Sequence, residues 1–190
     1  MRGHRGAESV PVVVIKDSET KGIKAHAVTQ KGCIDWVAER LVDDIDSFGH
    51  SGKVILKSDQ ENALVDLLRE VKEKRIRKGR DTLCENSKKY DSQSNGTAER
   101  AVQAIECIVR THKLALEKKL DRSIPSKHPI MTWMVEHGAS LLNKYQVGRD
   151  GRTSHERIKG KAYRGEMFAF GRKVRHMIPG KHSGGSMQNR

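Results

Sequence analysis

Two acidic residues follow patterns that place them at the end of a strand and near the start of a helix. Asp59 comes directly after the short apolar segment 53–58, and Glu99 stands three residues after Gly96, in the first turn of an expected helix over 97–119. Carboxylate oxygens suit the hard cation Mg²⁺, and two rigid elements can hold two carboxylates close together. The sequence therefore predicts a divalent-metal site for phosphoryl transfer.

The hydrophobic pattern predicts an α/β fold around these carboxylates. Apolar β-branched runs predict a hairpin, and strands then alternate with amphipathic helices, which favours helices packed on a mixed sheet. A Thr-x-x-Glu capping box at 153–156 predicts a further short helix. The expected strands are 10–15, 23–29, 53–58 and 82–85, and the expected helices are 33–48, 61–74, 97–119 and 129–145, with a polar loop over 86–95.

One face of the expected helix over 97–119 is polar. Its residues recur at steps of 4, 3, 4 and 3 and end in basic side chains, which could lie against a phosphate backbone. A solvated helix face is the alternative interpretation. The stripe consists of Glu99, Gln103, Glu106, Arg110 and Lys113.

Charge and composition favour a polyanionic partner. The net charge is +13, the pI is near 9.8, and residues 151–190 carry ten basic and two acidic side chains. No apolar run is long enough to span a bilayer, and no secretory signal is visible, so nucleic acid is favoured over a membrane. The seven basic residues within 69–80 are interpreted as a solvated face. The three cysteines lack zinc-finger or disulfide spacing and are expected to be small buried residues.

The order of these motifs resembles the catalytic core of retroviral-type integrases, with the nearest likeness in copia-type retrotransposon polyproteins. The resemblance covers roughly residues 10 to 175. It implies a ribonuclease-H-like fold and Mg²⁺-dependent cutting and joining of DNA. The residues that carry it are Val54-Ile55-Leu56-Lys57-Ser58-Asp59, then Asn95-Gly96-x-x-Glu99-Arg100, and downstream Gly151-Arg152-Thr153-Ser154-His155-Glu156.

The resemblance also implies roles for single residues. Asp59 and Glu99 would be catalytic residues and ligands of Mg²⁺ or Mn²⁺. DNA would be the partner of a homo-oligomeric protein located in the nucleus. The DNA-contacting residues would be Asn95, Arg100 and Gln103, with Arg110 and Lys113 added from the polar stripe.

Simpler interpretations of the two carboxylates stay open. Ser58 and Glu61 match a capping box, in which case Asp59 would only favour the start of a helix. Glu99 would be favoured by the helix dipole in a first turn, and Glu106 is a rival carboxylate two turns later.

The third carboxylate of the family has no counterpart in its expected place. In that family it ends an opening strand in the middle of the sheet, whereas here only nine residues precede the hairpin. Asp17 is the nearest substitute, but it lies in the hairpin turn, where a solvent-exposed aspartate is the default.

We therefore hypothesise a polyprotein fragment whose first aspartate and central strand are missing and which is inactive alone. Two apolar strands would then have unpaired edges. We expect a poorly ordered segment 1–9, a truncated core 10–146 and a basic, partly disordered extension 147–190. Whether the chain is an enzyme stays open, with a ribonuclease-H-like nuclease or a non-catalytic basic nucleic-acid-binding protein as alternatives.

Overall fold

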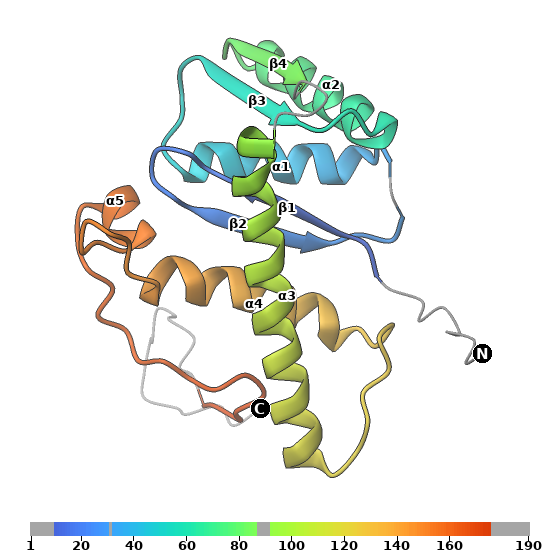
Figure 1. Ribbon diagram of the computed structural model, residues 1–190, viewed down its shortest axis with the longest axis vertical. Helices are drawn as coiled ribbons and strands as arrows, with labels where there is room; N and C mark the ends of the chain where they lie inside the picture. Colours follow the sequence, from blue (N-terminus) through green and yellow to red (C-terminus); the bar gives the residue numbers. More distant parts are fainter. Residues whose placement is uncertain (1–9, 31, 87–91, 176–190) are drawn as a thin grey trace, which may run out of the picture.

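A computed structural model describes residues 10–30, 32–86 and 92–175 of the chain, which form a mixed α/β fold (Figure 1). The alternation of strands and helices agrees with the sequence-based prediction. The elements are β1 (Val12–Lys16), β2 (Ile23–Ala27), α1 (Asp35–Ser47), β3 (Val54–Ser58), α2 (Asn62–Arg77), β4 (Thr82–Asn86), α3 (Ser92–Leu120), α4 (Ile130–Tyr145) and α5 (Ser154–Lys159).

The strands form two separate two-stranded sheets. β1 pairs with β2 in antiparallel fashion, and β3 pairs with β4 in parallel fashion. From top to bottom, Figure 1 shows the order β4, β3, β1, β2. Between β1 and β3 the described residues contain no strand pairing, so both strands present an unpaired edge. The α/β fold class with flanking helices is thus confirmed, although the described strands form two small sheets rather than one mixed sheet.

One helical layer serves both sheets. α1 and α2 contribute a buried apolar cluster that includes Leu41 and Val71, and inward-facing residues of β1 and β3 pack against it. The even spacing of Val13 and Ile15, and of Val54 and Leu56, places each pair on one face of its strand. The two sheets are therefore held in place by shared helices rather than by hydrogen bonds between them.

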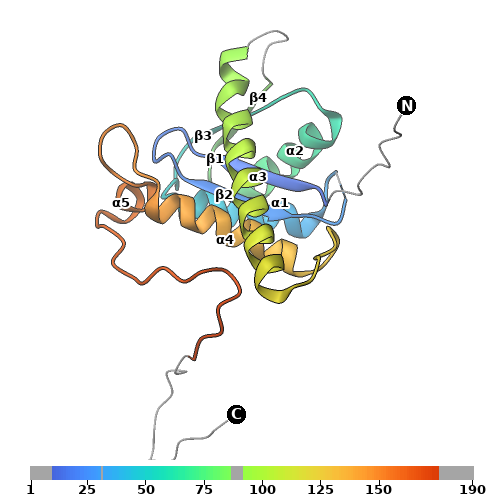
Figure 2. The same cartoon turned by 60° about the horizontal axis from the view of Figure 1, so that its bottom comes forward.

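The two sheets differ in how their other faces, which point away from α1 and α2, are covered. α3 and α4 cover the β1–β2 sheet, where Ile23 and Ala25 pack with Ala101, Ile105 and Val135. In Figure 2, α4 likewise lies across β2. On β3–β4 the paired residues Ile55 and Leu83 remain 49% and 39% exposed. The second sheet is thus covered on one face only.

The polar loop over 86–95 is shorter than predicted, because α3 begins at Ser92. Asn95 and Gly96 are weak helix formers, but adding residues to an existing long helix costs far less than nucleating one. The prediction that Glu99 lies in the first helical turn is therefore wrong. It lies in the second.

The basic run within 69–80 is not uniformly solvated, since Arg75 is fully buried. Its Nη1 lies 3.0 Å from Asp46 Oδ1, and its Nε donates to Thr82 Oγ1 at 3.0 Å. Its Nη2 donates to the carbonyl of Gly52 at 3.2 Å. Arg75 therefore ties α2 to α1, to β4 and to the turn before β3.

The three cysteines are free, but the expectation that they are buried is wrong. Cys33, Cys84 and Cys107 are all exposed. Cys107 illustrates the reason: on α3 the buried positions include Ala101, Ile105 and Leu116, and Cys107 lies off that face.

The segment after α4 returns to the core. The predicted capping box is present, with Thr153 Oγ1 accepting from the Glu156 N–H at 3.2 Å. Ser154 Oγ donates to the Lys21 carbonyl at 2.6 Å, and Phe170 stacks on His112 with ring centroids 5.6 Å apart. The expected domain division at residue 147 stays a prediction.

Candidate metal and nucleic-acid site

Asp59 is exposed and follows the last residue of β3. Its Oδ1 accepts a hydrogen bond from the backbone N–H of Glu61 at 3.2 Å. The capping box of Ser58 and Glu61 is not formed, because Ser58 Oγ donates to the Asp59 carbonyl and the N-cap residue, Glu61, makes no side-chain cap bond. Within the described residues no basic side chain pairs with Asp59, so its carboxylate is accessible to a cation.

Glu99 is also exposed, on the N-terminal part of α3. No cation pairs with it within residues 92–175 or the other described ranges. The neighbouring Arg100 donates from Nε to the carbonyl of Gly96 at 2.9 Å, which holds its side chain along the helix. The helix dipole does not explain Glu99, because the first turn of α3 contains no acidic residue.

The two carboxylates suit a hard cation by their chemistry. In Figure 1 the N-terminal end of α3 rises to the level of β3, the strand that Asp59 follows. Mg²⁺ is commonly bound by one or two carboxylates and keeps several waters, which fits two exposed carboxylates without basic partners. Among the described residues, however, no three His, Cys, Asp or Glu side chains gather into a metal-binding group.

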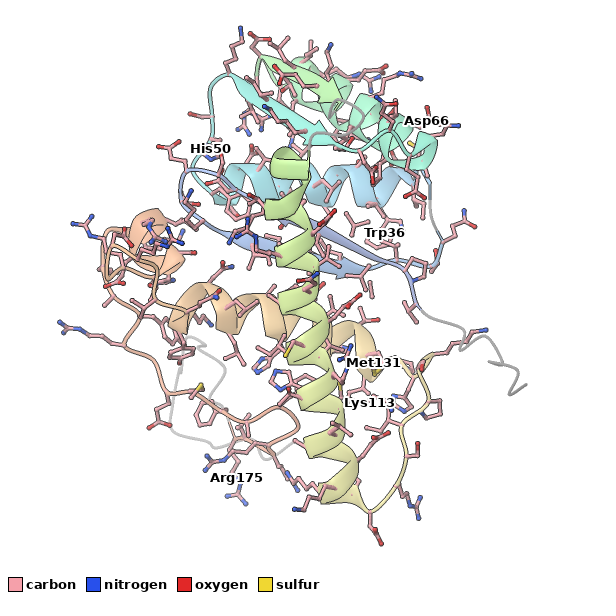
Figure 3. All side chains as sticks on the ribbon, in the orientation of Figure 1. Trp36, His50, Asp66, Lys113, Met131 and Arg175 are labelled. Carbon is pink, nitrogen blue, oxygen red and sulfur yellow. The ribbon has the colours of Figure 1, made fainter. Side chains whose placement is uncertain are left out.

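The polar stripe of α3 is exposed over most of its length. Gln103, Glu106 and Arg110 face solvent. Lys113 is half-buried and donates to Glu117 Oε1 at 2.7 Å, and Figure 3 shows it on the lower half of α3. The pKa of the Glu117 carboxyl is lowered by the backbone N–H of Ile124 and by Lys113.

Lys113 is therefore engaged at the far end of the stripe, whereas Arg110 is free to contact a ligand. The side chain of Asn95, which the sequence also places in the site, lies outside the described part of the chain.

Asp17 belongs to the hairpin turn, as the sequence indicates, but it is not solvent-exposed. Its side chain is 11% exposed. Its Oδ2 accepts from the N–H and the hydroxyl of Thr20 at 2.7 and 2.5 Å, and its Oδ1 contacts His50 Nε2 at 2.9 Å. Burial alone would raise the pKa of Asp17, but the hydrogen bonds from Thr20 and His50 outweigh it and lower the pKa. Its role is to fix the turn.

Comparison with known proteins gives a structural likeness only. No family model matches the sequence, and no curated protein matches it. A solved structure described as the catalytic core domain of BIV integrase is similar with a TM-score of 0.53 and 16% sequence identity. The match covers 77% of this chain and 84% of that one. The chain therefore has an integrase-core, ribonuclease-H-like fold. No helix in the described ranges is long and apolar enough to cross a membrane.

The sequence did not reveal a group of basic residues at the outer edge of β2. Arg40, Lys144 and Lys159 come from three different helices and line one cavity. Arg40 and Lys159 are 119 positions apart in the sequence, so no spacing rule could have connected them.

Proposed function

We propose that this chain is the core of an integrase-type polynucleotidyl transferase that binds DNA, with Asp59 and Glu99 as ligands of Mg²⁺ or Mn²⁺. One observation carries the proposal. Two exposed carboxylates, which no basic side chain of the described residues pairs with, lie after β3 and on α3, in a fold similar to the catalytic core of BIV integrase. The proposal includes an origin in a copia-type retrotransposon, which rests on the sequence motifs.

In this proposal Asp59, after β3, and the residues along α3 have different roles. Asp59 and Glu99 supply oxygen ligands, and a divalent ion bound to them would polarise a scissile phosphodiester. Arg100 and Arg110 contact phosphates of the DNA backbone, and Gln103 between them contacts sugar or base edges. Asn95 and Lys113 mark the two ends of the contact.

Non-catalytic DNA binding is the second candidate, and the ligand count favours it. Three carboxylates serve the metal ions in the family that the sequence resembles, and the described residues contain no such group of three. A protein with two carboxylates could still hold DNA in a Mg²⁺-sensitive manner without cutting it. We expect the chain alone to follow this behaviour.

The experiment compares DNA binding and DNA products for four single variants. Asp59→Asn and Glu99→Gln test the site, and Asp81→Asn and Glu106→Gln are controls that remove one exposed carboxylate elsewhere. We expect Mg²⁺ to strengthen binding of an end-labelled duplex in the wild type and both controls, but not in the site variants. Equal responses in all five proteins would contradict the proposal.

The nucleic-acid products of the reaction distinguish between the candidate activities. Joined DNA ends that disappear in Asp59→Asn and Glu99→Gln would establish strand transfer and overturn the inactive-fragment hypothesis. Cleavage of an RNA–DNA hybrid without joining would identify a nuclease instead. No product from the wild type together with Mg²⁺-sensitive binding would support the non-catalytic candidate.

A further inference from the structure

A cavity lies at the outer edge of β2, on elements that carry neither Asp59 nor Glu99. It is lined by residues of β2, α1, α4 and α5 and has a volume of about 290 Å³. Figures 1 and 2 both show α5 near the end of α4, and His155, Ile158 and Lys159 of α5 line the cavity. We refer to it as the edge pocket.

The edge pocket is strongly basic. Four lysine or arginine side chains and two histidines line it, against one acidic residue, Glu136. These basic and imidazole side chains are Lys24, Arg40, Lys144, Lys159, His26 and His155.

Most of this charge is not neutralised by the protein. Lys24 Nζ lies 3.8 Å from Asp44 Oδ1. By contrast, Arg40, Lys144 and Lys159 form no ion pair with any residue in the described ranges. Three cationic groups that converge on one hollow without carboxylate partners create a positive potential that attracts anions.

Neighbouring contacts position two of the lining side chains. Lys144 Nζ lies 4.5 Å from the ring centroid of Tyr163, and the His155 ring meets the same tyrosine edge-on at 5.4 Å. Asn143 donates from Nδ2 to the Ile23 carbonyl at 2.7 Å and accepts from the Ile23 N–H at 2.8 Å. These bonds fix α4 against β2, so the walls of the edge pocket are held by the fold.

The negative charge of Glu136 is directed toward a histidine. His26 is 4% exposed, and its Nδ1 lies 3.3 Å from Glu136 Oε1 while its Nε2 lies 2.5 Å from Asp44 Oδ2. The hydroxyl of Ser140 makes no hydrogen bond within the described residues and lines the same cavity. The edge pocket therefore offers cationic groups and a free hydroxyl donor to an oxyanion.

We propose that the edge pocket binds a phosphate group. Arg40 provides a planar fork suited to phosphate oxygens, and Lys144 and Lys159 add point charges. The phosphate could belong to the backbone of a nucleic-acid strand or be a free inorganic ion, and both share the same recognition chemistry. The proposal does not depend on Asp59, Glu99 or a metal ion.

The test uses the full chain in EDTA, so that failure of the metal site does not affect it. The double variant Arg40→Glu/Lys159→Glu reverses the charge of two of the four lysine and arginine side chains of the pocket. Lys118→Glu/Arg122→Glu makes the same change of charge at two exposed residues near the end of α3. Amide NMR shifts are followed during titration with inorganic phosphate, and duplex DNA affinity is measured against salt concentration.

For the wild type and the control variant, we expect phosphate to shift the amides of Ser140 and Lys144. The pocket variant should lose these shifts. If the phosphate comes from nucleic acid, the slope of log affinity against log salt should fall by about 1 more in the pocket variant than in the control, since the contact to one phosphate is lost.

If phosphate shifts the Ser140 and Lys144 amides of the wild type, but the two double variants have equal salt slopes for DNA binding, the ligand is a free phosphate ion. Unshifted Ser140 and Lys144 amides together with equal salt slopes would overturn the proposal. Arg40→Gln/Lys159→Gln replaces the charge-reversal variant if circular dichroism shows that the latter is unfolded.

Discussion

The two sheets of this molecule have strands of equal length but very different surroundings. β1–β2 is enclosed between α1 and α2 on one side and α3 and α4 on the other. β3–β4 has helices on one face and leaves Ile55 and Leu83 on the open face. The enclosed sheet therefore contributes more of the stability of the fold, whereas the half-open sheet leads into the exposed residue Asp59.

The difference in burial between the two sheets has a physical reason. Residues that bind a ligand must remain accessible, so functional groups tend to lie in the parts of a fold with fewer buried contacts. The half-open sheet depends on α2 and on Arg75 for its attachment. Substitutions in the two regions should therefore have clearly different effects.

The largest effect is expected from Arg75→Met, which removes the link between the two regions. Asp46 keeps Arg80 as a partner, but the bonds of the buried guanidinium to Asp46, Thr82 and the Gly52 carbonyl are lost. At about 1 to 2 kcal/mol for each hydrogen bond from a charged donor, the free energy of unfolding should fall by about 3 to 5 kcal/mol. Arg77→Met, at an exposed position on the same helix, is the control and should cost less than about 1 kcal/mol. Urea unfolding monitored by tryptophan fluorescence measures both, and equal losses would contradict the role given to Arg75.

Leucine-to-alanine substitutions compare the buried helical layer with the open face of β3–β4. Leu41 of α1 is 3% exposed in the apolar cluster between the helices and both sheets, and Leu41→Ala should lower the free energy of unfolding by about 2 to 5 kcal/mol because it leaves a cavity. Leu83→Ala removes the same atoms from the open face and should cost less than about 1 kcal/mol. A large loss for Leu83→Ala would show that the open face is covered in solution.

A pH dependence is expected where Phe170 covers α3 and α4. Burial lowers the pKa of His112 and of His137 below the ordinary value of 6.5, with neighbouring His137 and Lys144 adding to the respective shifts. The Nε2 atoms of both rings are buried without a hydrogen-bond partner in the described structure. Neutral imidazoles are thus favoured in the folded state.

The direction of this dependence follows from proton binding. As pH falls through 6.5, the unfolded chain binds protons that the folded histidines resist, so the melting temperature should drop between about pH 7 and pH 5. His112→Phe should make that drop shallower, and His128→Phe, in the exposed loop before α4, should leave it unchanged. Identical pH profiles for wild type and His112→Phe would contradict this account.

The smallest effect is expected for the ion pair on the open face. Lys57 Nζ lies 3.3 Å from Glu85 Oε2, with both side chains about half exposed or more. Exposed pairs contribute little, so Lys57→Ala should change the free energy of unfolding by less than about 1 kcal/mol. A thermal melt at low and high salt checks this, and a loss above 2 kcal/mol at either salt concentration would contradict it.

The sequence predicted those parts of the fold that depend on local pattern. The amphipathic pattern over 33–48 predicted α1, β-branched runs predicted the hairpin, and the apolar segment 53–58 predicted β3. The start of α3 was missed because cooperative helix extension overrode the turn preference of Asn95 and Gly96. The burial of Arg75 was missed because its partners Asp46 and Thr82 are brought to it only by tertiary packing.

For the site, the sequence names candidate residues but not their geometry. Asp59 and Glu99 are exposed, and no basic side chain of the described residues pairs with them. Their role as ligands stays a proposal. The edge pocket had no sequence signal, since Arg40 and Lys144 belong to helices that meet only in the fold.

The most direct test of the central claim is paramagnetic broadening of amide NMR signals by Mn²⁺ in the presence of duplex DNA. If Asp59 and Glu99 share one ion, the amides around both residues should broaden at the same Mn²⁺ concentration. Asp59→Asn or Glu99→Gln alone should then abolish both effects, whereas Glu106→Gln should abolish neither. Broadening that persists around one residue after substitution of the other would contradict the account.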